Sequence, residues 1–252
     1  MGSSGQRNCV DPPAAIVLAG GAARRLGPVR PAGGKAACEV GGESLLSLVA
    51  AAVAPVMAEI VVVGGEQVPA DLRERFPSLR QLADSQPGAG PLAAIRDGLA
   101  DICQSRSTEG QPLPSAVLLA ACDLPALRPS LVRALLDRLL SAADDPAWVI
   151  PQIGSQPQYL FSACRPQLLD PLQVFLATGR RDLRGFAAAL VEHNADWVVT
   201  IPPTIWLQID PAGAAGRDID TPADLAALNG SASRDHCAGF ILHGGHGRSL
   251  GR

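Results

Sequence analysis

Short apolar runs alternate along the chain with longer stretches in which apolar residues recur at helical spacing. The short runs are rich in Val, Ile, Leu and Ala, and most are bounded by glycine, proline or a charged residue. Such runs predict strands that are buried on both faces, as in the centre of a parallel sheet. The predicted strands are Ala14–Ala19, Glu59–Val63, Leu79–Ala83, Ala116–Ala121, Trp148–Gln152, Tyr159–Ala163 and Trp197–Ile201.

The stretches between these runs have the apolar spacing of helices. Strands that alternate with helices indicate repeated β–α–β units, so we predict an α/β fold: a three-layer, Rossmann-like α/β/α sandwich with a mostly parallel sheet. Thr221 and Pro222 open the last helix as its cap and first-turn proline. The predicted helices are Ser44–Ala54, Gly90–Gln104, Arg128–Ala142, Pro166–Ala177, Asp182–His193 and Pro222–Leu228.

The remaining segments are predicted to be irregular. Ser105–Pro114 is expected to form a surface loop, and Pro202–Gly216, with three prolines, a longer irregular one. Residues 1–13 are small and polar, and residues 231–252 mix Ser, Gly, His and Arg without periodicity. We therefore predict disordered ends and one domain over residues 14–230.

Composition excludes several classes of protein. With 47% hydrophobic content, the 252 residues can bury a sizeable core. The formal charge of −3, with both signs interspersed, argues against the cationic stripe that nucleic-acid binding requires. No stretch approaches the roughly 18 unbroken apolar residues of a membrane helix. We expect neither nucleic acid nor a membrane as a partner.

The six cysteines show no metal-ligand spacing and no C-x-x-C pair, and nothing before them resembles a secretion signal. A reducing cytoplasm is the expected location. The histidines near the last cysteine fit no zinc pattern, and we interpret them as part of a disordered tail. These residues are Cys9, Cys38, Cys103, Cys122, Cys164 and Cys237, with His236, His243 and His246.

A glycine-rich turn follows the first predicted strand. Leu18, Ala19, Gly20 and Gly21 lead there into Ala22-Ala23-Arg24-Arg25-Leu26-Gly27. Glycines at such a turn let backbone amides approach phosphate oxygens. The turn matches neither the Walker pattern nor the dinucleotide fingerprint, and a pair of turn glycines alone is weak support for a phosphate site.

Two further motifs follow predicted strands, where open α/β sheets bind their ligands. Asp84 precedes Gln86-Pro87-Gly88-Ala89-Gly90-Pro91-Leu92, a turn that leads into a helix. This turn is either part of a ligand site or a helix-capping turn. The second motif is Cys122-Asp123-Leu124-Pro125. We interpret Cys122 as a small core residue, because no histidine lies near it in sequence.

The order and spacing of these motifs resemble those of nucleotidyltransferases, most of all the molybdenum cofactor guanylyltransferases. The resemblance covers about residues 14–230 and includes Leu18–Gly27, Lys35, Glu39–Leu45 and the motifs at Asp84 and Asp123. It implies the fold of nucleotide-diphospho-sugar transferases. Seven residues, Pro28–Gly34, separate Gly27 from Lys35, more than the family pattern has. Arg30 is therefore an alternative to Lys35, although the match after Lys35 favours the lysine.

The resemblance also implies a role for each matched residue. Leu18, Ala19, Gly20 and Gly21 would wrap the triphosphate. The candidate catalytic residues are Arg25 and Lys35, which would neutralise that triphosphate, and Asp123, which would hold Mg²⁺ through its carboxylate. Lys35, Asp84 and Asp123 would bind the nucleotide, with Asp84 recognising the base or ribose.

The C-terminal half carries weaker resemblances. Arg217–Leu225 resembles the closing segment of the family, with Asp218 and Asp220 in place of two amides. Asp220 is expected to complete the metal site beside Asp123 or only to cap the last helix. Gln156–Leu160 resembles a turn beneath the acceptor site, or is an ordinary start of a strand. Three arginines are expected to meet the acceptor phosphate or to form a solvated helix end: Arg180, Arg181 and Arg184.

The function implied is that of an enzyme that transfers GMP from GTP to molybdopterin-bound molybdenum cofactor, giving molybdopterin guanine dinucleotide and pyrophosphate. Its partners would be GTP, a molybdopterin-type cofactor, and molybdoenzyme apoproteins or other proteins of cofactor biosynthesis. Asp218 and Asp220 also match cytidylyl-transferring relatives. The alternatives are a cytidylyltransferase on the same cofactor, a sugar-1-phosphate nucleotidyltransferase, and a non-catalytic nucleotide-binding partner of molybdoenzymes.

Overall fold

The computed structural model describes residues 11–20, 31, 33–142, 146–213 and 216–228. Its strands are β1 (Ala14–Leu18), β2 (Glu39–Val40), β3 (Glu43–Ser44), β4 (Glu59–Val63), β5 (Leu79–Leu82), β6 (Val117–Ala121), β7 (Trp148–Ile153), β8 (Gln156–Pro157), β9 (Phe161–Cys164) and β10 (Val198–Ile201). Its helices are α1 (Leu45–Val53), α2 (Ala70–Arg75), α3 (Pro91–Thr108), α4 (Pro129–Leu140), α5 (Leu169–Ala177), α6 (Leu183–His193) and α7 (Pro203–Ile209). Short 3₁₀ turns cover Lys35–Ala37, Pro166–Leu168 and Ala195–Trp197, and residues 222–228 are helical.

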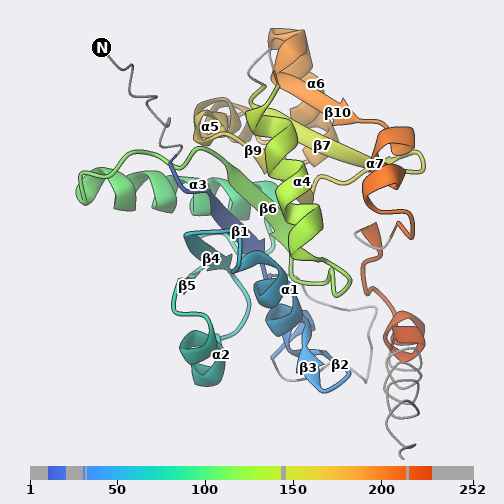
Figure 1. Ribbon diagram of the computed structural model, residues 1–252. Coiled ribbons are helices and arrows are strands. Elements are labelled where there is room, and N and C mark those ends of the chain that lie inside the picture. Colours follow the sequence, from blue (N-terminus) through green and yellow to red (C-terminus); the bar gives the residue numbers. More distant parts are fainter. Residues whose placement is uncertain (1–10, 21–30, 32, 143–145, 214–215, 229–252) are drawn as a thin grey trace, which may run out of the picture.

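The central sheet has the strand order β10-β7-β9-β6-β1-β4-β5, with β8 paired to β7 (Figure 1). β1 pairs in parallel with β4 and β6, β4 with β5, and β10 with β7. The predicted mostly parallel sheet is confirmed. Two strands depart from the parallel direction: β9 runs antiparallel to both β6 and β7, and the short β8 runs antiparallel to β7.

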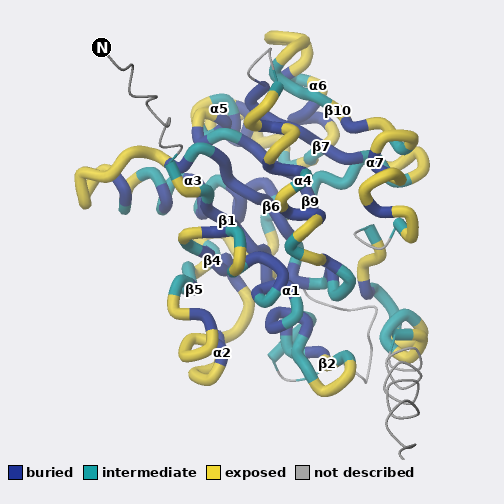
Figure 2. Tube along the Cα trace, in the orientation of Figure 1, coloured by how far each residue is buried: buried dark blue, intermediate teal, exposed yellow. Residues whose placement is uncertain are grey.

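Helices cover both faces of this sheet. Along β1, Ala15 and Val17 face one way and Ala14 and Ile16 the other, as the period of a strand requires. One apolar cluster packs the first face against α1, α2, α4 and α7, and the second packs the other face against α3, α5 and α6. The central strands β1, β4, β6 and β9 are accordingly among the most buried parts of the trace (Figure 2). The predicted three-layer sandwich is confirmed.

Two segments that we expected to be irregular contain helix. α3 continues to Thr108, into the predicted surface loop, and α7 lies inside Pro202–Gly216. In α7 the prolines stand at the cap and first turn, where a missing N–H costs no hydrogen bond. Trp206 anchors this helix: it is fully buried, with its ring 5.7 Å from that of Phe161.

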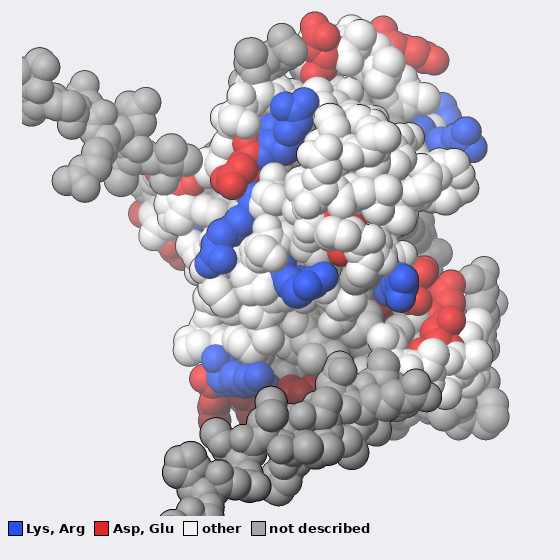
Figure 3. Space-filling view, turned by 45° about the vertical axis from the view of Figure 1, so that its right-hand side comes forward, with Lys and Arg blue, Asp and Glu red and all other residues white. Residues whose placement is uncertain are grey.

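Other expectations concern the ends and the surface of the protein. The predicted disordered segments fall largely (1–13) or wholly (231–252) outside the described residues. On the face shown in Figure 3, basic and acidic side chains are interspersed. No helix in the described ranges combines the length and apolar character needed to cross a membrane.

Candidate functional site

The residues that directly follow four of the strands lie at one edge of the sheet. β1, β4, β5 and β6 are mutually parallel neighbours, so their carboxyl ends lie together. Backbone hydrogen bonds continue past the strands: Ala19 N donates to Val63 O at 3.0 Å, and Cys122 N to Leu18 O at 3.0 Å. The motifs that contain Gly20, Asp84 and Asp123 therefore share one edge, as expected of a ligand site in an open α/β sheet.

Gly64 links two of these motifs, and sequence reasoning missed it. It has a φ of +72°, and a Cβ there would lie 3.4 Å from the Gly20 Cα and 3.5 Å from the Asp84 Cβ. A side chain would therefore meet the turn after β1 and the residue after β5 in a backbone conformation that L-residues rarely adopt. The available signal was the pair Gly64-Gly65 directly after a buried apolar run.

The glycine-rich turn is described in part. Leu18 and Ala19 are buried and Gly20 is exposed. Gly21, Arg24, Arg25 and Arg30 lie outside the described residues. The expected contact of Arg25, or of Arg30 in place of Lys35, with a triphosphate remains a prediction.

Lys35 lies between two carboxylates. Its Nζ is 2.5 Å from Asp123 Oδ2 and 2.7 Å from Asp220 Oδ1. The side chains of Lys35 and Asp123 are 13% and 14% exposed, and that of Asp220 is 37% exposed. Burial by itself lowers the pKa of Lys35, but hydrogen bonds and charge from Asp123 and Asp220 outweigh it and raise that pKa above its ordinary value. Lys35 is therefore a charged ammonium throughout the neutral range.

Local hydrogen bonds explain how Asp220 reaches this position from the far end of the sequence. Ile219 is buried, and its N–H donates to the backbone oxygen of Asp123 at 3.2 Å. Thr221 and Asp224 form a reciprocal cap at the start of the last helix: Asp224 N donates to Thr221 Oγ1 at 3.2 Å, and Thr221 N to Asp224 Oδ2 at 2.7 Å. The capping side chains are thus Thr221 and Asp224, while Asp220 turns to Lys35.

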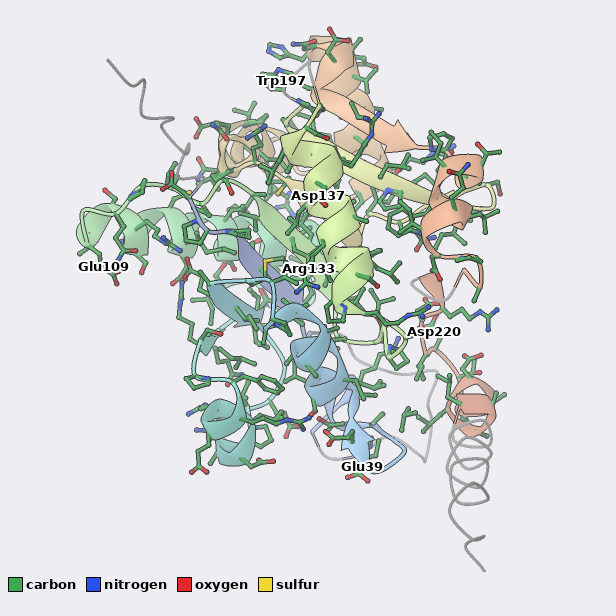
Figure 4. All side chains as sticks on the ribbon, viewed as in Figure 1. Glu39, Glu109, Arg133, Asp137, Trp197 and Asp220 are labelled. Carbon is green, nitrogen blue, oxygen red and sulfur yellow. The ribbon has the colours of Figure 1, made fainter. Side chains whose placement is uncertain are left out.

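Asp220 lies on the segment that joins α7 to that helix (Figure 4). Two residues before it, Asp218 has a raised pKa, first because of burial and then because of the negative charges of Asp220 and Asp123. Among the described residues no group of three or more His, Cys, Asp or Glu side chains is arranged to hold a metal ion. The two carboxylates around Lys35 nevertheless converge on one cation.

Cys122 adjoins the site but cannot serve as its nucleophile. The side chain is 2% exposed, and burial, followed by the charge of Asp123, raises its pKa to about 12. A thiol with such a pKa carries almost no thiolate at neutral pH. The interpretation of Cys122 as a core residue agrees with this geometry.

The turn after Asp84 is fixed to the start of α3. Asp84 Oδ1 accepts the Gln86 N–H at 2.9 Å, and Asp97 Oδ2 accepts the Ser85 N–H at 2.9 Å. Arg96 donates to Ser85 Oγ at 2.8 Å. Asp84 thus holds its own turn, and the residue is half-buried.

Asp97 makes the stability of this turn depend on pH. Burial alone raises its pKa, but the Ser85 hydrogen bonds and Arg96 outweigh burial and lower it. A lowered folded-state pKa means that the stabilisation is complete above the ordinary carboxyl pKa of about 4 and is lost as pH falls through the folded value. We expect Asp97→Asn to reduce the unfolding free energy by about 1 kcal/mol at pH 7 and by less at pH 3. Chemical denaturation at both pH values measures the difference; an equal loss at both would contradict the assignment.

The predicted basic turn lies beside this loop, but two of its arginines bind locally. Gly90 has a φ of +92°, and a Cβ there would lie 3.8 Å from the backbone oxygen of Arg181. Arg180 lies over the Phe175 ring at 4.7 Å, and Arg181 Nη1 donates to Leu176 O at 2.7 Å at the end of α5. These two guanidinium groups thus hold a helix end.

Arg184 instead lines a cavity of about 410 Å³ with Tyr159 and Pro157, under α6. Gln156 and Pro157 form β8, so the predicted turn contains a short strand that pairs with β7. Of the three arginines expected near an acceptor, only Arg184 is among the residues that line this cavity.

The sequence matches a family model described as "MobA-like NTP transferase domain" over residues 15–195. That span holds Lys35, Asp84 and Asp123 and covers more than half of the chain. The chain belongs to the MobA-like NTP transferase family. This NTP transferase is therefore a nucleotidyltransferase, as the motifs predicted; such enzymes generally use a divalent metal ion. Asp220 lies beyond the matched residues.

Curated relatives and solved structures agree with the family. A probable molybdenum cofactor guanylyltransferase of Chloroflexus aggregans is 30% identical over 221 residues, which are 83% of this NTP transferase and 90% of the relative. A molybdenum cofactor guanylyltransferase of Rhodopseudomonas palustris is 31% identical over 234 residues, 92% and 98% of the two chains. The structure of molybdopterin-guanine dinucleotide biosynthesis protein A from Archaeoglobus fulgidus has the same fold, with a TM-score of 0.65, 22% identity and coverage of 88% and 99%.

Proposed function

We propose that this NTP transferase transfers GMP from GTP to molybdopterin-bound molybdenum cofactor, forming molybdopterin guanine dinucleotide and pyrophosphate. The observation that carries the proposal is the meeting of Lys35, Asp123 and Asp220 at the sheet edge that also holds Gly20 and Asp84. The relatives named as molybdenum cofactor guanylyltransferases support guanine as the base and the molybdenum cofactor as the acceptor.

The reaction requires no nucleophilic side chain. An oxygen of the acceptor's terminal phosphate attacks the α-phosphorus of GTP in line, and the bond from that phosphorus to the oxygen bridging to the β-phosphate breaks. The electron pair of that bond leaves with pyrophosphate. Because the acceptor phosphate is already ionised, the protein has to position the two substrates and stabilise the charge that develops on pyrophosphate.

The residues at the sheet edge suit these tasks. Gly20 and the residues after it would offer backbone amides to phosphate oxygens, and Lys35 and Arg25 would supply positive charge for the departing pyrophosphate. Asp84, a half-buried residue after β5, would accept the donors of the base or the ribose.

Asp123 and Asp220 would hold the divalent metal ion, for which we propose Mg²⁺. The fit follows from the donor set, since both are carboxylates and both already contact one cationic atom. When bound there, the ion would offset the charge of the phosphates, whose oxygens and water would supply its other ligands. We also propose that the product passes to molybdoenzyme apoproteins or other proteins of cofactor biosynthesis.

Nucleotide choice gives the first test. In the presence of Mg²⁺, GTP at 100 times its dissociation constant should stabilise the protein by about 2.7 kcal/mol, and CTP, ATP and UTP by much less. Thermal denaturation with each nucleotide measures this. Asp84→Ala should abolish the preference for GTP, whereas Asp137→Ala should not, because Asp137 is an exposed residue of α4.

The other outcomes favour particular alternatives. A shift specific to CTP would indicate a cytidylyltransferase, and no shift with any nucleotide would contradict the enzyme proposed here. A GTP shift without dinucleotide formation from molybdenum cofactor would favour a different acceptor, such as a sugar 1-phosphate, or a non-catalytic nucleotide-binding protein. Mass spectrometry of the reaction mixture separates these possibilities.

A further inference from the structure

The position of the Lys35 ammonium that the proposed function requires differs from the one in the structure. As a phosphate ligand its ammonium should face the triphosphate, yet its Nζ lies 2.5 Å from Asp123 and 2.7 Å from Asp220, the two carboxylates proposed to hold the metal ion. An ammonium and a divalent ion between the same two carboxylates would repel each other at short distance. Lys35 and the metal ion therefore compete for one position.

The cluster needs a cation when no ligand is bound. The Asp123 side chain is 14% exposed, so its carboxylate would be poorly solvated without a cation; that of Asp220 is 37% exposed, but the two neighbouring carboxylates would still repel each other. With Lys35 the three side chains carry a net charge of −1, the sum of +1, −1 and −1. The ammonium can leave this position at low cost when a second cation replaces it and phosphates receive it.

We propose that Lys35 is a placeholder cation that exchanges with the metal ion when the nucleotide binds. In the nucleotide-free enzyme it keeps Asp123 and Asp220 together; with nucleotide and metal ion present, its ammonium moves to the triphosphate. This inference rests on the proposed function. It predicts that the metal ion and the nucleotide each increase the affinity of the protein for the other, because both favour the same displacement of Lys35. It also predicts that the metal ion alone binds weakly.

The local structure permits this movement. Lys35 begins a 3₁₀ turn, and two glycines, Gly33 and Gly34, directly precede it. Gly34 has a φ of +69°. A lysine also carries its compact charge on a flexible four-carbon stem, whereas a guanidinium is planar and rigid. Lys35 is the single lysine of the 252-residue sequence, beside 20 arginines.

Binding of Mn²⁺ to nucleotide-free protein tests the exchange without turnover. Electron paramagnetic resonance of free Mn²⁺ should show that Lys35→Met binds the ion about tenfold more tightly than the wild type, because the competing charge is gone. The same variant should bind GTP more weakly, so the two affinities change in opposite directions. Lys35→Arg keeps the charge and should leave Mn²⁺ binding weak, and Arg75→Met, which removes an exposed cation paired with Glu43, should change neither affinity.

The single lysine permits a second test on the unchanged protein. After incorporation of ¹³C,¹⁵N-lysine, the nuclear magnetic resonance spectrum contains one ammonium nitrogen signal, that of Lys35 Nζ. We expect this signal to stay in place with millimolar Mg²⁺ alone and to move when GTP and Mg²⁺ are added together. A signal that does not move with GTP and Mg²⁺ would overturn the exchange.

The results distinguish this inference from the function on which it rests. If GTP and Mn²⁺ bind together to the wild type but Lys35→Met does not tighten Mn²⁺ binding, the exchange is wrong and the transferase proposal stands. If the wild type binds no GTP, with or without Mn²⁺, the transferase proposal itself fails. The exchange then fails with it.

Discussion

Asp123→Asn should lower kcat/KM for guanylyl transfer by about 100- to 1,000-fold, the usual effect of removing one charged or hydrogen-bonding partner of a transition state. The substitution keeps the size of the side chain and removes its negative charge. It weakens the proposed metal site, where Asp220 would be the remaining carboxylate, and it removes one of the two carboxylates that contact Lys35. Steady-state kinetics with GTP, Mg²⁺ and molybdenum cofactor measure the loss.

The fold should survive this substitution. The C-terminal segment is attached here through the backbone oxygen of Asp123, which accepts the Ile219 N–H at 3.2 Å, so the contact does not need the carboxylate. Asp137→Asn is the matched control, because it changes the same kind of side chain at an exposed position of α4 (Figure 4). Activity of Asp123→Asn within a few-fold of the control would exclude Asp123 from the proposed catalytic role.

Much of the fold is predictable because its strands are buried on both faces. The strand Glu59–Val63 has no exposed face, so the four residues after Glu59 are all apolar, and the predicted and observed bounds are the same. α2 has one buried residue, Leu72, in a polar sequence and gives no such signal. α7 was missed because proline usually breaks a helix, although at the cap and first turn it starts one.

The site was predictable where it follows strand ends and unpredictable where it depends on distant contacts. Lys35, Asp84 and Asp123 belong to local motifs, and the sheet brings those motifs to one edge. The contact between Lys35 and Asp220 joins residues 185 positions apart, and no local pattern specifies it. Thr221 and Asp224, not Asp220, supply the side chains that cap the last helix, as the pattern Thr-x-x-Asp would have suggested; the role of Asp220 as a metal ligand stays a prediction.

A second large effect is expected from Gly98→Val in α3. An added Cβ would lie 2.9 Å from the Cδ1 and Cγ1 atoms of Ile16, in the middle of β1, so α3 packs on this strand too closely for a side chain. We expect the unfolding free energy to fall by about 3 kcal/mol, the upper range for overpacking a core. We also expect nucleotide binding to weaken, because α3 begins at the turn after Asp84 and β1 ends just before Gly20. Both turns belong to the proposed nucleotide site.

Three further variants separate this contact from the helical preference of valine. Gln104→Val places the same residue at an exposed position of α3 and should cost less than about 1 kcal/mol, since only helix propensity changes. In the Gly98→Val background, Ile16→Ala should cost much less than it does in the wild type, because the space that it opens relieves the clash. Denaturant unfolding of the wild type and of these four variants measures the losses. Equal losses for Gly98→Val and Gln104→Val would contradict the close packing of α3 on β1.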